Sequence, residues 1–479
     1  MGLTAFYNSF AAQSFYETWL VLLTALCLLL LLVERYVSGL EKGLTVKESA
    51  DDKLESARPP NSGNALKVLA RKYLIVYAMV MGADWLQGPY VYSLYREQYG
   101  FPERLVALLF VTGFVSAGMA APLVGVWADQ HGRRKLCLAF CVTYALACIL
   151  ILFPALPILL GGRLLGGIST SILFSAFESW LISSASAAGL PSADLSTIMG
   201  RATLVNGFVA TGAGVFSNKL VASTGNFASP FIASGCLLVL AYFVISGTWL
   251  ENYGSGGGSV TTDVFQLERL GQAWRIVRED PMLLVLGLTQ TCFEGSMYLF
   301  VFIWVPSLQQ VTNYDGTLPF GYIFSSFMVS MMIGSLLYTM IVAYSKIKGV
   351  DSSLTTHAKL SSIVCAVSAL ALASSISSRS EEVRFWAFCA FEACVGMYYP
   401  VQGMLRGTLI SNEHRATLSS LFRVPLNIFV VFSLLTGVSS ARQAVLSGSA
   451  IMLAFSSLMT GAVIVNQSDV VAVGNGHRA

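Results

Sequence analysis

The apolar residues of this chain come in blocks of about twenty, the length at which a helix crosses a hydrocarbon core roughly 30 Å thick. The block from Leu20 to Val33 is interrupted only by Thr24. A transmembrane barrel would show short segments of alternating polarity, so this block excludes a barrel for at least its own segment. Charged residues make up 11% of the chain, against roughly 25% in a soluble domain. The sequence therefore predicts an all-α polytopic membrane protein.

Thirteen apolar segments are long enough to be spans. Their expected ranges are 18–33, 73–95, 105–127, 136–153, 162–187, 199–221, 228–250, 282–305, 320–343, 359–376, 384–405, 416–438 and 444–465. Residues 1–16 contain no Lys or Arg, whereas the polar stretch after the first segment contains eight, so that segment is expected to be a helix and not a cleaved signal peptide. The same charge bias predicts an extracellular or luminal N-terminus and a cytosolic C-terminus, in the plasma membrane.

The longest connection among the last twelve segments divides them into six plus six. It runs from Glu251 to Asp280 and contains the Gly and Ser run Gly254–Ser259, which is typical of a flexible linker. The expected organisation is an extra N-terminal helix with its cytosolic connection (1–72), a six-helix half (73–250), a linker (251–280), a second six-helix half (281–465) and a cytosolic tail (466–479).

An internal repeat relates the two halves. Phe174, Ala176, Phe177 and Glu178 recur as Phe388, Ala390, Phe391 and Glu392, 214 residues later, and the tetrapeptide at 201–204 recurs at 415–418 with the same offset. Parallel repeats of this kind are typical of transporters whose halves are related by an axis along the membrane normal. The repeat predicts that Glu178 and Glu392 occupy equivalent positions.

Four carboxylates lie inside the expected spans: Asp84, Glu178, Glu294 and Glu392. Because a carboxylate at the bilayer centre costs roughly 2.5 to 3.5 kcal/mol, each is a candidate for substrate binding, the alternative being a packing role in a pair with a neighbouring Arg. Asp84 and Glu294 are also the candidates for proton coupling, because burial in an apolar medium disfavours the charged form of a carboxylate.

Arg423 is the strongest candidate for a substrate-binding cation. It lies about two turns inside its span and is followed by Pro425, which can bend the helix. Arg406 is expected near a cytosolic helix end, with its side chain turned toward the membrane interface. Gln87 and Tyr90 follow Asp84 closely and can bind a polar ligand without adding a charge, although aromatic residues in such helices are more often packing residues.

The sequence lacks the residues that several other classes of function require. No Gly-rich nucleotide loop ending in Gly-Lys-Ser/Thr occurs, and a net charge of +3 gives no reason to expect a nucleic acid partner. The nine cysteines fall in apolar blocks and are interpreted as packing residues, and the four histidines are assigned to polar connections. We therefore expect no metal, no cofactor and no enzymatic activity.

The loop Gly125-Val-Trp-Ala-Asp129-Gln-His-Gly132-Arg133-Arg134-Lys135 resembles the signature loop of the major facilitator superfamily. Arg163 with Gly167 is similar to the helix 4 motif of the same superfamily, and a packing role for these two residues is an open alternative. The resemblance implies twelve core helices in two halves. It also implies a gating role for Gly125, Asp129, Gly132, Arg133, Arg134 and Arg163.

A closer resemblance connects the chain to the molybdate-anion transporter family. The segments that carry it are Asp84-Trp-Leu-Gln-Gly-Pro-Tyr-Val-Tyr92, Gly162–Thr170, Phe174–Trp180, Glu251-Asn-Tyr253, Phe324–Met328 and Phe422-Arg-Val-Pro-Leu-Asn427. This resemblance implies uptake of molybdate, and it adds Asn427 to the candidate binding residues. The second copy of the signature loop is eroded to Lys346-Ile-Lys348-Gly349.

Together these observations predict a transporter that imports a small oxyanion by alternating access, with protons as a possible coupling ion. The expected partners are the oxyanion, protons and membrane lipid, and we expect a monomer. Two other readings fit the sequence. One is a membrane nutrient sensor that binds without transport, and the other is a transporter of an organic or sugar substrate.

Overall fold

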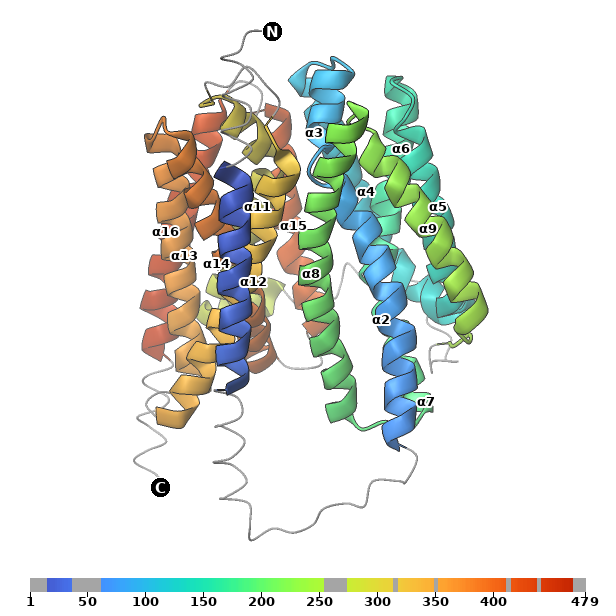
Figure 1. Ribbon diagram of the computed structural model, residues 1–479. Coiled ribbons are helices and arrows are strands. Elements are labelled where there is room, and N and C mark those ends of the chain that lie inside the picture. Colours follow the sequence, from blue (N-terminus) through green and yellow to red (C-terminus); the bar gives the residue numbers. More distant parts are fainter. Residues whose placement is uncertain are drawn as a thin grey trace. The chain divides into compact units, whose positions relative to one another are not determined.

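A computed structural model describes residues 15–36, 62–253, 274–312, 318–348, 352–410, 415–436 and 441–467. Within these ranges the regular secondary structure is entirely helical (Figure 1). The linker run Gly254–Ser259 and most of the tail lie outside the described residues.

The described residues form two compact units. The first unit comprises those of Leu54–Val264 and Pro319–Ser325, and the second comprises those of Met1–Lys53, Phe265–Leu318 and Ser326–Ala479. Each unit has a hydrophobic core of its own.

The first unit is built from eight α-helices and one π-helical turn. They are α2 (Ser62–Gln87), α3 (Val91–Ser93), η2 (Leu94–Gln98), α4 (Glu103–His131), α5 (Arg133–Leu150), α6 (Leu156–Leu173), α7 (Ala176–Ala187), α8 (Ser192–Thr224) and α9 (Ser229–Thr248). Trp180 and Trp249 stack in the core with ring centroids 3.6 Å apart. Large aromatic residues of this kind bury much apolar surface, and they hold α7 against the end of α9.

The second unit contains the helix Phe15–Tyr36 and the helices that follow residue 280. The latter are α11 (Pro281–Gln309), α12 (Phe320–Lys348), α13 (Ser353–Ser377), α14 (Glu381–Leu409), α15 (Arg415–Thr436), α16 (Arg442–Met459) and η3 (Thr460–Val465). The first residues of α12 belong to the first unit.

The helix Phe15–Tyr36, dark blue in Figure 1, packs on the start of α14. The Tyr16 hydroxyl donates to Glu381 at 2.5 Å, and the rings of Trp19 and Trp386 meet edge to face at 4.8 Å. A hydroxyl on an apolar helix needs such a partner because lipid offers none. The extra N-terminal helix is therefore part of the second unit.

Glycines let two helices of the second unit approach closely. A Cβ on Gly334 of α12 would lie 1.8 Å from the carbonyl oxygen of Ala393, and one on Gly396 of α14 would lie 1.9 Å from that of Met331. Association of helices in lipid depends on van der Waals contact, which small residues at the interface permit. These two glycines fix the line along which α12 and α14 touch.

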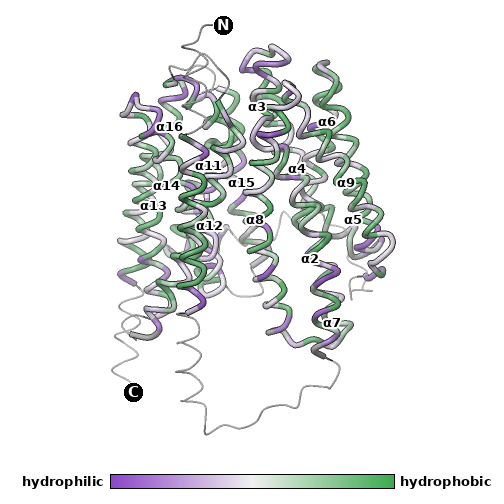
Figure 2. Tube along the Cα trace, viewed as in Figure 1, coloured by the Kyte–Doolittle hydropathy of each residue, from purple (hydrophilic) through white to green (hydrophobic). Residues whose placement is uncertain are grey.

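Each of the thirteen expected spans falls on helical segments of the described residues. Several observed helices extend beyond the expected ends, as for α8, which begins at Ser192 and not at 199, whereas α9 is shorter than its expected span at both ends. Two expected spans are broken. In 73–95 the helix stops at Gln87 and restarts at Val91, and in 162–187 it stops at Leu173 and restarts at Ala176. By length and hydropathy, eight helices among the described residues qualify as membrane spans. Hydrophobic residues predominate along α9, and hydrophilic residues gather near the start of α2 (Figure 2).

Candidate functional site

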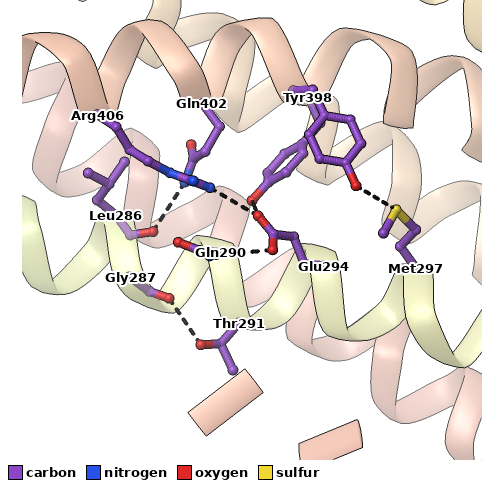
Figure 3. Close-up of polar contacts among 10 residues, drawn as sticks. Leu286, Gly287, Gln290, Thr291, Glu294, Met297, Tyr398, Gln402 and Arg406 are labelled. Carbon is purple, nitrogen blue, oxygen red and sulfur yellow. Dashed lines mark hydrogen bonds and ion pairs between the residues drawn. The ribbon is translucent and has the colours of Figure 1, made fainter. Parts of the chain in front are cut away.

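Glu294 is the centre of a polar cluster between α11 and α14 (Figure 3). It is 9% exposed, and its Oε1 atom lies 3.0 Å from Nη2 of Arg406. The Tyr398 hydroxyl donates to the same oxygen at 3.2 Å, and Nε2 of Gln290 donates to Oε2 at 3.3 Å. The expectation that Arg406 turns toward the membrane interface is therefore wrong. Its guanidinium instead compensates the charge of a carboxylate that few polar groups surround.

Two buried amides complete this cluster. Gln290 and Gln402 are each 1% exposed, and Nε2 of Gln402 donates to the carbonyl of Leu286 at 3.2 Å. The ring of Phe293 stacks on Tyr398 with centroids 4.0 Å apart, which holds the tyrosine in place. Among the described residues, three buried atoms of the cluster have no hydrogen-bond partner: Oε1 of Gln290, Oε1 of Gln402 and Nε of Arg406. Such atoms are unfavourable unless water or a ligand pairs with them.

Asp84 lies in the first unit, near the end of α2. It is half-buried, and the Tyr144 hydroxyl of α5 donates to its Oδ1 at 2.6 Å. Arg163 of α6 acts electrostatically on Tyr144, the tyrosine that donates to Asp84. A short bond from a neutral hydroxyl stabilises the carboxylate without neutralising it.

Gln87, the last residue of α2, and Tyr90, just before α3, bond to neighbouring helices. Gln87 donates to the Ser234 hydroxyl at 3.0 Å, and Tyr90 donates to Oδ1 of Asn218 at 2.8 Å. Tyr90 is buried, whereas Gln87 is half-buried. The structure therefore gives both residues a packing role in this state, and their role in substrate binding stays a prediction.

Arg423 and Asn427 lie on α15, and both are exposed. They are four residues apart, so they share one face of the helix. Tyr298, one turn beyond Glu294 on α11, interacts electrostatically with both Glu294 and Arg423. Arg423 is exposed, and among the described residues no hydrogen bond or ion pair joins it to the cluster of Figure 3.

Glu178 and Glu392 differ in burial and in their distance from the start of their helices. Glu178 is exposed and lies 22 residues after Leu156, in the first turn of α7, whereas Glu392 is 7% exposed and lies 11 residues after Glu381. If the two helices are aligned at their first residues, Leu156 and Glu381, the two glutamates are therefore about three helical turns apart. The equivalence of the two positions stays a prediction.

The signature loop is held by Glu251 at the end of the first unit. Gly132 has φ of 103° and ends α4, and the Glu251 carboxylate accepts from the backbone N–H groups of Arg134 at 2.8 Å and Lys135 at 3.1 Å. These N–H groups form the start of α5, where a helix favours an anion. The predicted gate included the glycine and the basic residues but not Glu251. The signal that could have identified it is the Glu251-Asn-Tyr253 motif, which is part of the family resemblance but to which no role was assigned.

The basic residues of the loop also contact the end of α9. Nη2 of Arg134 donates to the carbonyl of Ser246 at 2.6 Å, and the N–H of Arg133 donates to the carbonyl of Asn252 at 3.0 Å. Gly125 and Asp129 both lie in α4, and the side chain of Asp129 lies outside what the structure describes. The gating role of this loop stays a prediction.

Arg163 is half-buried and lies against α4. Its Nε donates to the carbonyl of Leu109 at 3.1 Å, and its guanidinium carbon lies 5.3 Å from the centre of the Phe110 ring. A Cβ on Gly167 would lie 2.4 Å from the carbonyl oxygen of Gly113, so this glycine is required for the contact of α4 with α6. Both residues of the helix 4 motif thus have packing roles in the first unit.

Two assignments made from the sequence need comment. His357 does not lie in a polar connection but is 3% exposed in α13, where it contacts the Tyr338 hydroxyl at 3.0 Å. It fills a packing position because its ring nitrogens are satisfied there. All nine cysteines are free, and eight are buried as a packing role requires, whereas Cys236 is exposed.

A family model described as sugar transporters with 12 TM matches residues 17–390 of this chain. The match covers the helix Phe15–Tyr36 almost from its start and extends into α14.

Curated relatives cover most of the chain. A molybdate-anion transporter from Takifugu rubripes is 31% identical over 409 residues, covering 79% of this chain and 82% of its own length. A molybdate-anion transporter from Xenopus tropicalis is 32% identical over 386 residues, with the same coverage of both chains.

Solved structures show the same fold at low sequence identity. A crystal structure of the nucleoside transporter NupG matches with a TM-score of 0.66 at 10% identity, covering 82% of this chain and 99% of that one. A D-xylose-proton symporter matches with a TM-score of 0.61 at 10% identity, covering 83% and 98%. These likenesses concern the fold alone.

Proposed function

Because this chain belongs to the molybdate-anion transporter family of the major facilitator superfamily, we propose that it imports molybdate or a related small oxyanion by alternating access. The protein is an integral membrane protein with the helical fold of such transporters. Rocking of two helical halves about a site near the midplane is the general mechanism of this fold.

The observation that carries the proposal, beside the relatives, is the arginine chemistry of the second unit. Arg406 lies on α14 and Arg423 on α15, two helices that both contact α11. Arg406 is paired with Glu294, whereas Arg423 is exposed. A guanidinium keeps its charge when it is buried and offers parallel N–H donors to two oxygens of an anion. Arg423, with Asn427 one turn away, is our first candidate for contact with the substrate, and Gln87, Tyr90, Glu178 and Glu392 are further candidates.

Import of a divalent anion into a negative cytosol opposes the membrane potential at roughly 2.3 kcal/mol per charge per 100 mV. A co-transported cation removes that opposition, and protons are the simplest choice. Asp84 and Glu294 are the proposed proton sites, because each is a carboxylate in a membrane helix with a tyrosine hydroxyl bonded to it. We also propose the plasma membrane as the location, with the N-terminus outside and the C-terminus in the cytosol, from the bias of Lys and Arg.

The test is uptake of labelled molybdate by a host that lacks its own molybdate uptake, with the full chain expressed and its surface amount measured. Saturable uptake that unlabelled molybdate abolishes and sulfate inhibits supports the proposal. Binding without uptake would replace it with the sensor, and no binding of either oxyanion would overturn both.

A second candidate is transport of a sugar, which the description of the matching family model favours. The buried amides of Gln290 and Gln402 are the kind of group that binds hydroxyls. Competition separates the two candidates. A sugar that inhibits molybdate uptake at the molybdate site, or is itself taken up, supports the second candidate.

A further inference from the structure

Arg406 uses only part of its hydrogen-bonding capacity. Its Nη2 atom lies 3.0 Å from Glu294, whereas its Nε atom is buried and has no partner among the described residues. The Arg406 side chain is 25% exposed, more than twice the 11% of the Glu294 side chain. A guanidinium has five N–H donors, and a buried donor without a partner is unfavourable. The arginine is therefore bound on one side and open on another.

We propose that Arg406 is a binding residue for the transported oxyanion and that Glu294 is its exchangeable counter-ion. This inference rests on the proposed function and names the residues that link the substrate to the proton. Glu294 holds the guanidinium when no anion is present. Protonation of Glu294 releases the guanidinium, which then binds two oxygens of a tetrahedral dianion.

The exchange follows from charge. A carboxylate and a dianion on one guanidinium repel each other, and the repulsion is strong where the surroundings are apolar. The stacked rings of Phe293 and Tyr398 provide such surroundings beside Glu294. Arg406 therefore binds either the ionised Glu294 or the oxyanion, unless a proton neutralises Glu294.

The side-chain amide of Gln290 can form a hydrogen bond with Glu294 whether that carboxyl group is ionised or protonated. Its Nε2 donates to Oε2 of the carboxylate at 3.3 Å, while its Oε1 is buried without a partner among the described residues. Rotation of the amide by half a turn exchanges the two atoms, so that Oε1 accepts the hydrogen of a protonated Glu294. The Tyr398 hydroxyl, 3.2 Å from Oε1, can likewise donate to the acid or accept from it. The cluster thus stays hydrogen-bonded when the proton arrives.

Few charged groups face Glu294 from the helices around α11. On α14 these are Arg406 and Tyr398, with Tyr399 nearby, whose hydroxyl donates to the sulfur of Met297. The buried carboxylate of Glu392, also on α14, acts electrostatically on Tyr399 as Glu294 does. On α15 the group is Arg423, which acts through Tyr298 of α11 itself. Where α16 and η3 meet α11 they present the hydroxyls of Ser456 and Thr460 to Thr289. Arg406 is thus the only cation in the described part of the chain that is paired with Glu294.

The proposed step conserves charge and atoms. A proton passes from external water to an Oε atom of Glu294, and the anion takes its place on Arg406. On the inner side the anion leaves, the proton returns to water, and the ion pair forms again. No bond other than O–H changes, and no redox partner is needed.

A double variant separates binding from a structural role. In Arg406→Gln a buried carboxylate loses its cation, so uptake is lost for either reason. Glu294→Gln with Arg406→Gln leaves no unpaired charge. If the pair only holds α11 to α14, the double variant regains uptake; if Arg406 binds the anion, uptake stays absent while surface amount and thermal stability return. Restored uptake in the double variant would overturn the proposal.

The single variants give a second readout. We expect Arg406→Lys to raise the KM for molybdate about tenfold or more, because the paired donors to the anion are lost. Glu294→Gln should retain uptake and depend less on external pH than the unmodified protein does. Arg384→Lys is the matched control, since that buried arginine donates only to carbonyls in the described chain, those of Ser307, Ser375 and Ser378. It should leave the KM and the pH profile unchanged.

Failure of this inference is distinguishable from failure of the proposed function. If the unmodified protein imports molybdate and Arg406→Lys keeps its KM, the exchange is wrong and the transport function stands. If the unmodified protein imports no molybdate, thermal stabilisation of the purified protein by molybdate, sulfate or phosphate still reports on Arg406. Stabilisation that disappears in Arg406→Lys supports the site, and stabilisation by none of the three anions overturns it.

Discussion

The carboxylate of Glu251 occupies the space that a side chain on Gly132 would fill. A Cβ built on Gly132 lies 2.6 Å from the Glu251 side-chain carbon Cδ, and the glycine has φ of 103°, which L residues rarely adopt. From this position the carboxylate accepts from the N–H groups of Arg134 and Lys135. The glycine of the signature loop thus makes room for an acidic residue that arrives from more than a hundred residues away in the chain.

Gly132→Ala is expected to lower stability by about 2 to 4 kcal/mol, as the sum of backbone strain and displacement of Glu251. The measurement is thermal unfolding of the purified protein in detergent. The matched control is Gly100→Ala, where φ is 69° and a Cβ meets nothing within 4 Å, so that strain acts alone. If both variants lose the same amount of stability, displacement of the Glu251 side chain has no measurable energetic cost.

The contact of α12 with α14 gives a second pair of variants. Gly396→Ala places a methyl group 1.9 Å from the carbonyl oxygen of Met331, so the helices must separate, at a cost of roughly 1 to 3 kcal/mol. Gly403→Ala lies on the same helix with nothing within 4 Å of its Cβ, and there alanine should be neutral or stabilising. The readout is again the melting temperature. If Gly396→Ala has the same melting temperature as the unmodified protein, α12 and α14 do not approach each other as closely as described.

Apolar length was enough to place the helices, because each block of about twenty residues can satisfy its backbone only as a helix in lipid. The same reasoning could not place side chains. Arg406 lies near a helix end, where the sequence favours an interfacial position, yet it pairs with Glu294 because α11 and α14 are neighbours. Glu178 and Glu392 match in sequence and differ in burial: Glu178 is exposed in the first turn of α7, whereas Glu392 is buried inside the continuous α14. The position of the Arg406 side chain and the burial of the two glutamates depend on which helices pack together, and a single sequence does not contain that information.

Arg423→Lys tests the first candidate for substrate contact. The substitution keeps the positive charge on the exposed face of α15 but removes the planar pair of donors, so the KM for molybdate should rise about tenfold. The measurement is initial uptake rate against molybdate concentration at matched surface expression. Arg442→Lys, a change near the start of α16, is a suitable control. An unaltered KM and rate in Arg423→Lys would remove this residue from the site.

Asp84→Asn tests proton coupling in the first unit. Asn keeps the acceptor for the Tyr144 hydroxyl, which donates to Asp84 at 2.6 Å, but it cannot take up a proton. In the unmodified protein, uptake should rise as the external pH falls, because protonation removes a negative charge from the path of an anion. In Asp84→Asn the rise should be smaller, even if the maximal rate is lower, whereas Tyr144→Phe keeps the carboxylate and should keep the rise. The profile is measured at fixed membrane potential over roughly pH 5 to 8, the range that a buried carboxyl group can reach. A flat profile in the unmodified protein would exclude coupling through Asp84, and a full rise in Asp84→Asn would assign it to another group.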